Sequence, residues 1–175
     1  MATATKDRNG TKTIAREVSK ENTPESPVVK DLRQQVANAV LLYLNYKHYH
    51  WQTFGPHFRD LHKLFDNFAE EVLETIDELA ERVRMIGQTP PAHPLEAMDL
   101  ASVAPAAPHS TMREMLEEAN RNALVVIRDM RKAAKTADEH DDPGTVDMFS
   151  KFVQIHEKHE WWIRDTLQEG DGLSD

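Results

Sequence analysis

Histidines and carboxylates recur at helical spacing in one segment of the sequence. His62 and Asp66 lie four residues apart, as do Asp77 and Glu81, so the members of each pair project from one helix face. His50 precedes them and continues a line of apolar residues that faces the expected core. Imidazole and carboxylate ligands together suit a hard or borderline divalent metal. This segment therefore predicts a site for iron, manganese or zinc.

The separation of the two pairs decides how a metal could be held. Asp66 and Asp77 are 11 residues apart, which returns to nearly the same helix face about 16 Å further along. Ligands lie about 2 Å from a metal, so the two pairs of one chain cannot share one ion. His62 and Glu81 have the same sequence midpoint as Asp66 and Asp77. Antiparallel pairing of two copies of this helix therefore brings both pairs together.

Two other arrangements compete with this shared site. Either pair alone would also suit the solvated face of a charged helix. A di-iron site inside a single four-helix bundle normally displays Glu-x-x-His pairs, but no histidine in this sequence has a glutamate three residues before it. The sequence therefore favours two identical metal sites built across an interface between two chains.

Long helices must position these residues. The expected boundaries are about Pro27 to Thr53 for the first helix, Pro56 to Gly87 for the second, and Leu95 to Ala101 for a short one. A capping box, Thr111–Glu114, opens the next long helix, and the segment "DEHDDPGT" separates it from the last. Strand-like alternation is absent from the sequence. The predicted fold is all-α: an antiparallel four-helix bundle with a short extra helix in its middle connection.

Composition limits the class of protein. The chain has 175 residues, enough for one domain, and a formal net charge of −9 that disfavours nucleic acid as a partner of the body. It has no cysteine, which excludes disulfides and thiolate metal sites. Its longest apolar run is far below the roughly 20 residues of a membrane helix. We expect a cytoplasmic protein with a flexible tail at residues 1–27, a bundle at 28–169 and a C-terminal tail at 170–175.

The segment "HYHWQTFGPHFRDLHKLFDNFAEEVLETIDELAERV" resembles the signature of the Dps proteins, the mini-ferritins. The shared pattern is His-Trp, a Gly-Pro-x-Phe turn, His-x-x-x-Asp, and Asp-x-x-x-Glu eleven residues after the first aspartate. The plan of helices extends the resemblance over about residues 28–168.

The resemblance implies a hollow shell of twelve subunits with ferroxidase sites at its two-fold interfaces. The five ligands would be His50, His62 and Asp66 of one chain with Asp77 and Glu81 of its mate. The family oxidises Fe(II), with hydrogen peroxide preferred over dioxygen, and stores ferric mineral inside the shell. Zinc and manganese are alternative occupants of the same site. Trp51 would lie beside the site as an electron donor, or else pack in the core.

Four other histidines, outside the five predicted ligands, have other expected roles. His57 stands where Asn or Gln is commoner in the family, so it is a turn residue, with an accessory metal contact as the alternative. His48 points about 200° away from its neighbour His50 and is expected at the surface. His156 and His159, with Glu160, could form a secondary metal site, but buried and hydrogen-bonded histidines are the favoured interpretation.

An acidic cluster marks the entry to the last helix. Asp141, Asp142 and Asp147 fall where the family places its three-fold pore, and carboxylates converging from three chains would draw Fe(II) inward. An ordinary polar loop is the alternative.

The first 20 residues carry five basic side chains against two acidic ones. Twelve such tails could bind DNA weakly, without sequence preference and in a salt-sensitive way. The alternative function is therefore a DNA-condensing, nucleoid-associated protein in which metal oxidation is secondary.

Overall fold

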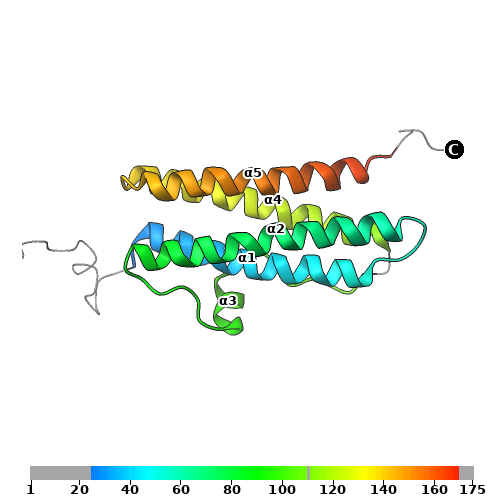
Figure 1. The fold of residues 1–175 in the computed structure, drawn as a ribbon, viewed down its shortest axis with the longest axis horizontal. Helices are drawn as coiled ribbons and strands as arrows, with labels where there is room; N and C mark the ends of the chain where they lie inside the picture. Colours follow the sequence, from blue (N-terminus) through cyan, green and yellow to red (C-terminus); the bar gives the residue numbers. More distant parts are fainter. Residues whose placement is uncertain (1–24, 110, 170–175) are drawn as a thin grey trace, which may run out of the picture.

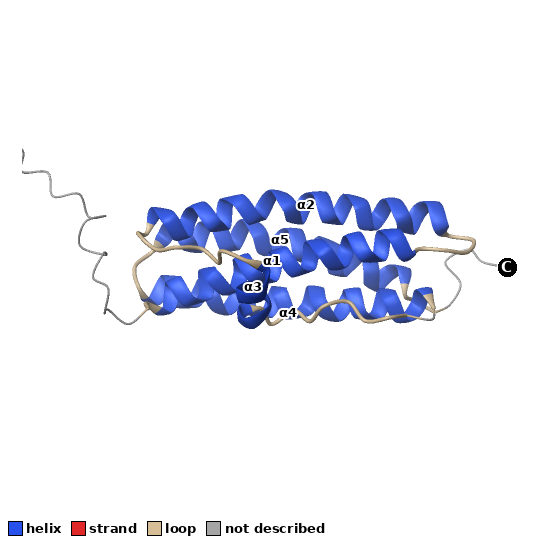
Figure 2. Cartoon of the chain, turned by 90° about the horizontal axis from the view of Figure 1, so that it is seen from below, coloured by secondary structure: helices blue, strands red, loops and turns tan. Residues whose placement is uncertain are grey.

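The computed structural model describes residues 25–109 and 111–169, and within them every regular element is a helix. The helices are α1 (Pro27–Gln52), α2 (Phe58–Met85), α3 (Pro94–Leu100), α4 (Met112–Glu139) and α5 (Pro143–Thr166). The four long helices lie side by side in one elongated bundle, and short α3 lies outside it on the connection between α2 and α4 (Figures 1 and 2). The predicted all-α bundle is confirmed. Of the predicted tails, 1–27 and 170–175, residues 1–24 and 170–175 lie outside the described residues, whereas Ser26 caps α1 and Pro27 already belongs to it.

The helix ends follow local side-chain chemistry. The predicted capping box is present, with the Thr111 hydroxyl accepting from the amide of Glu114 and the Glu114 carboxylate accepting from that of Thr111. The prediction that α2 opens at Pro56 was wrong by two residues. Gly55 adopts a left-handed conformation, with φ of 85°. A hydrogen bond from the amide of Phe58 to the carbonyl of Gly55 closes a four-residue turn, and α2 begins only at Phe58.

The bundle is built as two helical hairpins. α1 packs mainly against α2, and α4 mainly against α5, while contacts between α1 and α4 join the hairpins. Apolar side chains at helical spacing fill the space between them, including Leu42, Phe65 and Met130, each 1% exposed or less. The packed core fixes the C-terminal part of α1 against the start of α2, where the candidate metal ligands lie.

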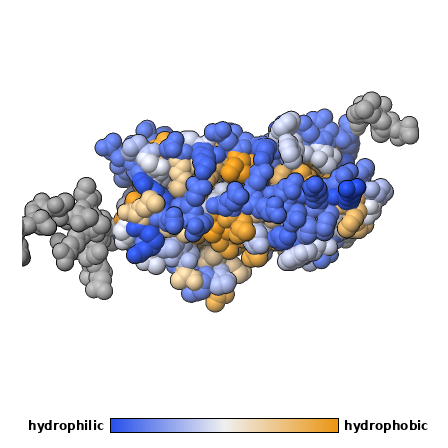
Figure 3. Space-filling view, in the orientation of Figure 1, coloured by the Kyte–Doolittle hydropathy of each residue, from blue (hydrophilic) through white to orange (hydrophobic). Residues whose placement is uncertain are grey.

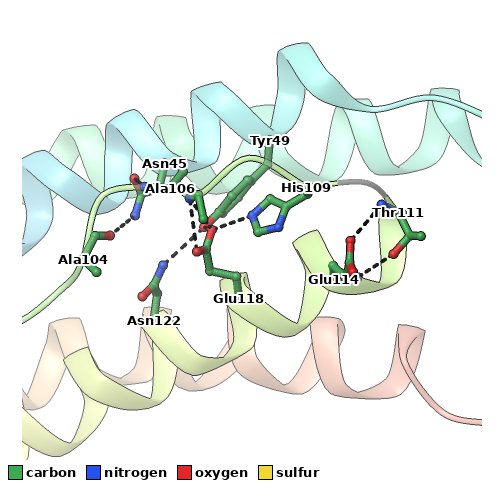
Figure 4. A network of polar contacts seen from close by, with 10 residues as sticks. Asn45, Tyr49, Ala104, Ala106, His109, Thr111, Glu114, Glu118 and Asn122 are labelled. Atoms are coloured by element: carbon green, nitrogen blue, oxygen red, sulfur yellow. Dashed lines mark hydrogen bonds and ion pairs between the residues drawn. The ribbon is translucent and has the colours of Figure 1, made fainter.

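Beyond α3, the long connection between α2 and α4 is attached to α1 by side-chain hydrogen bonds. Asn38 accepts hydrogen bonds from the amides of Ser102 and Val103, and Asn45 binds the chain at Ala104 and Ala106. These asparagines lie about two helical turns apart on α1, so they support the connection along its length; Figure 4 shows the contacts of Asn45.

A polar network centred on Glu118 continues this attachment at the start of α4. Its carboxylate accepts from the hydroxyl of Tyr49 at 2.7 Å, from Nε2 of His109 at 2.7 Å and from the amide of Ala107 (Figure 4). Burial alone would raise the pKa of Glu118, but these hydrogen bonds outweigh it and lower the pKa below its usual value. Nothing in the sequence analysis singled out this network.

His156 and His159 are fully buried in the core, as predicted. His159 donates through Nε2 to the Glu71 carboxylate at 3.0 Å, but neither nitrogen of His156 has a hydrogen-bond partner among the described residues. The predicted hydrogen bonding is therefore right for His159 and wrong for His156. Burial lowers the pKa of both rings to about 3, so both are neutral at pH 7.

The surface shown in Figure 3 is mostly hydrophilic, with hydrophobic atoms exposed in patches near the middle of that face. Among the described residues, no helix combines the length and hydropathy that crossing a bilayer requires.

Candidate metal centre

The two candidate histidine ligands form a reciprocal pair across the turn between α1 and α2. Nδ1 of His50 lies 2.7 Å from the carbonyl oxygen of His62, and Nδ1 of His62 lies 2.8 Å from that of His50. A carbonyl oxygen only accepts, so each Nδ1 carries the hydrogen and each neutral ring keeps its lone pair on Nε2. A metal-binding histidine is typically oriented in this way by a carbonyl or carboxylate on its other nitrogen.

Packing fixes the same two rings in place. The imidazoles of His50 and His62 stack with their centroids 3.6 Å apart, and the ring of Phe58 stacks on the other side of His62 at 5.0 Å. Both side chains are half-buried, which limits their rotamers while leaving an edge open to solvent. The pair is thus oriented before any metal arrives.

Asp66 lies beside this pair on the next turn of α2. Its Oδ1 is 3.8 Å from Nδ1 of His50 and 2.7 Å from the ammonium of Lys47. The hydrogen bond from Lys47 lowers the pKa of Asp66 below its usual value, so this carboxylate is ionised at neutral pH. Lys47 was not predicted as part of the site, although it stands three residues before His50 and therefore on the same side of α1.

Asp77 and Glu81 lie further along α2 and are exposed. Along the helix, Asp77 lies about 16 Å from Asp66, as the spacing required, and Glu81 lies about 22 Å from it. Within residues 25–109 and 111–169, no three histidine, aspartate or glutamate side chains are close enough to hold a metal ion. A single chain therefore presents two separate, incomplete sets of ligands.

Trp51 follows His50 in the last turn of α1 and is 65% exposed. This excludes the alternative that it packs in the core of its own subunit. Phe54 and Phe58 of the adjoining turn are also about half exposed, so apolar side chains surround this end of the bundle. His57, in the same turn, is exposed and makes no side-chain hydrogen bond that caps α2.

The three aspartates of the expected pore differ in their surroundings. Asp142 is the N-cap of α5, accepts from the amide and hydroxyl of Thr145, and forms an ion pair with Arg82. Although burial would raise its pKa, these contacts lower it overall. Asp141 and Asp147 are exposed. Any role in an entry pore therefore rests mainly on those two residues, because Asp142 is held by contacts within the chain.

The ferritin-like domain family matches residues 29–173, and the bundle described above has that architecture. The most informative curated relatives are a DNA protection during starvation protein of Brevibacillus brevis and general stress protein 20U of Bacillus subtilis. They are 34% and 31% identical to this chain; each alignment covers 78% of it, and 92% and 94% of the respective relative. The chain belongs to the Dps family of ferritin-like proteins. The solved structure of Dps from Thermosynechococcus elongatus is similar, with 44% identity, a TM-score of 0.82, and coverage of 85% of this chain and 94% of that one.

Proposed function

We propose that this chain is a ferroxidase and iron-storing mini-ferritin, for which Fe(II) is the substrate. The observation that supports this most directly is the reciprocal pair of His50 and His62, which leaves the lone pair of each Nε2 free for a metal. The ionised carboxylate of Asp66 lies close to the pair, 3.8 Å from Nδ1 of His50. Imidazole nitrogen with carboxylate oxygen suits iron. Zinc and manganese would be competing occupants of the same ligands.

The site becomes complete when a second copy adds its Asp77 and Glu81. The outer face of α2 that carries these residues also exposes Leu73, which is 49% exposed in the single chain and provides apolar area for a partner helix. The added carboxylates stabilise the ferric state because hard anionic oxygens favour the higher charge. Twelve 20.0 kDa chains related by two-fold and three-fold axes would close into a shell.

Hydrogen peroxide is the proposed preferred oxidant. Two Fe(II) ions each give one electron, the O–O bond of one peroxide breaks, and two protons complete two molecules of water. Because both oxidising equivalents are consumed together, no hydroxyl radical is released. The histidines hold the ferrous ion, the carboxylates neutralise its growing charge, and Trp51 stands beside the site as a donor to any stray one-electron oxidant.

We expect one peroxide to be consumed for every two Fe(II) ions when the metal is added without oxygen and peroxide follows. Ferric absorbance, residual peroxide and a spin trap would be read together, with particle mass measured before and after. Mass should correspond to twelve chains plus retained iron. One peroxide per Fe(II), accompanied by a trapped hydroxyl radical, would contradict the proposed activity.

DNA condensation is a second candidate function, favoured by the name of the relative from Brevibacillus brevis and by the basic side chains of residues 1–20. The tail lies outside the described residues, and the chain carries a net charge of −9. Deleting residues 2–20 should abolish retardation of DNA in a gel and leave Fe(II) oxidation unchanged. Wild-type retardation should also weaken steeply with added salt. Retardation that survives the deletion would place the contact on the helical body.

A further inference from the structure

A second group of side chains of the types that ligate metals lies at the start of α4, outside the candidate iron site. His109, Met112, Met115 and Glu118 recur at every third residue, and the last three lie on α4, so their side chains follow one another along one side of the helix. The sequence has no cysteine, so methionine thioethers are its only sulfur ligands. None of these four residues is used by the proposed ferroxidase reaction.

Three of these side chains line a single pocket of about 330 Å³. His48 and Gln52 of α1 form one wall, and His109, Met112 and Met115 form the other. Met115 is fully buried, whereas Met112 is half-buried. The thioether of Met112 accepts a hydrogen bond from the amide of Phe54 at 3.5 Å, so its sulfur faces the turn that follows α1, and Phe54 lines the same pocket.

His109 has the second contact that is typical of a metal ligand. Its Nε2 donates to the carboxylate of Glu118 at 2.7 Å, which leaves the lone pair of the neutral ring on Nδ1 (Figure 4). Glu118 is itself held by the hydroxyl of Tyr49 and the amide of Ala107, so the ring has a fixed orientation. A histidine backed by a carboxylate is the usual arrangement around protein-bound metals.

We propose that this pocket binds one cuprous ion per chain, through Nδ1 of His109 and the sulfurs of Met112 and Met115. Soft thioether ligands select Cu(I), and imidazole also suits copper, whereas iron prefers the carboxylates of the other site. The single positive charge of Cu(I) is balanced by the Glu118 carboxylate, one hydrogen bond away on His109. His48, on the opposite wall, lies at the edge of the same pocket.

The test is an anaerobic titration of the assembled protein with Cu(I), in competition with a chromophoric chelator such as bicinchoninate. Wild type should bind one tightly held copper per chain, with both sulfur and imidazole nitrogen neighbours in its X-ray absorption spectrum. Replacing both Met112 and Met115 by leucine keeps the side-chain volume. It should weaken binding by at least about tenfold, on the scale of metal-site substitutions, and remove the sulfur signal.

Matched controls separate this pocket from other copper contacts. Met148→Leu on α5 changes a methionine outside the pocket, and Asp77→Asn damages the candidate iron site; both should keep the tight copper and its sulfur neighbours. Glu118→Gln should weaken binding about 10- to 100-fold through the orientation of His109. If the double leucine variant does not assemble, Met112→Leu alone carries the test because that side chain is only half-buried. Unchanged affinity in the leucine variant, or copper with nitrogen and oxygen neighbours only in wild type, would overturn the proposal.

Discussion

Replacing Asp77 with asparagine should slow peroxide-driven oxidation of Fe(II) by at least about a hundredfold, since loss of a direct ligand should exceed the 10- to 100-fold cost of losing an outer contact. The substitution removes a negative charge from the proposed iron site without changing side-chain size. Asp77 is exposed in the single chain, so folding should not depend on it. Ferric absorbance gives the rate, and light scattering shows whether the particle still assembles. Wild-type rates in the assembled variant would mean that Asp77 is not a ligand.

A mixture of two damaged chains tests whether the site is shared. One chain carries His50→Ala and His62→Ala, and the other carries Asp77→Asn and Glu81→Gln. In a mixed dimer the intact histidines of the second chain meet the intact carboxylates of the first, which rebuilds one site and concentrates all the defects in the other.

Random pairing of equal amounts places about half of the dimers in the mixed state, so about a quarter of all sites should regain activity. Each variant refolded alone is the control. Mass spectrometry must show mixed particles. If they form and oxidise Fe(II) no faster than the separate variants, the five residues do not form one site across the interface.

The second large predicted effect is a loss of folding stability at acid pH, caused by the buried His156. His156 is buried and neutral, with its pKa lowered from 6.5 to about 3 by burial and then by His159. Because this pKa is lowered, the neutral His156 contributes fully to the free energy of unfolding above pH 6.5. That contribution is lost as the pH falls from 6.5 toward 3. At pH 5, the free energy of unfolding should have fallen by about 2 kcal/mol from His156 alone. Glu71 of α2 and Tyr46 of α1 face the same histidine pair.

Thermal unfolding of metal-free protein between pH 7.5 and pH 4 would measure this loss. His156→Leu should flatten the profile, because leucine cannot gain a proton and leaves no unpaired nitrogen in the core. His57→Gln removes an exposed histidine and should leave the wild-type profile unchanged. A leucine variant with the wild-type slope would assign the acid sensitivity to other groups.

Most of the fold could be predicted from the sequence because each pattern used involves residues close together in the chain. Apolar spacing predicted the four long helices, and Thr111 with Glu114 formed the capping box that the pattern required. The start of α2 was less accessible. A proline at the first helical position was expected. Instead, Gly55 is left-handed and Pro56 lies within the turn from Gly55 to Phe58 that precedes the helix.

Only part of the candidate metal site could be predicted from the sequence. Spacing on one helix related His62 to Asp66, and a two-chain arrangement followed from geometry. The salt bridge of Lys47 with Asp66 and the inward contact of Asp142 with Arg82 depend on packing between helices. Periodicity within one helix carries no information on such pairs. Whether the five predicted ligands bind iron stays a prediction that the kinetic experiments decide.

Because of the reciprocal histidine pair, the length of the α1–α2 turn determines how both imidazoles are oriented, and it would set the metal affinity of the proposed site. Each ring is anchored to the backbone of the opposite helix, so the register between His50 and His62 is set by the short segment from Thr53 to His57. One residue added there would rotate the first turn of α2 by about 100° and break both anchors at once. Loop insertions are usually well tolerated at a protein surface. Here the turn acts as a spacer whose length cannot vary without freeing both imidazoles.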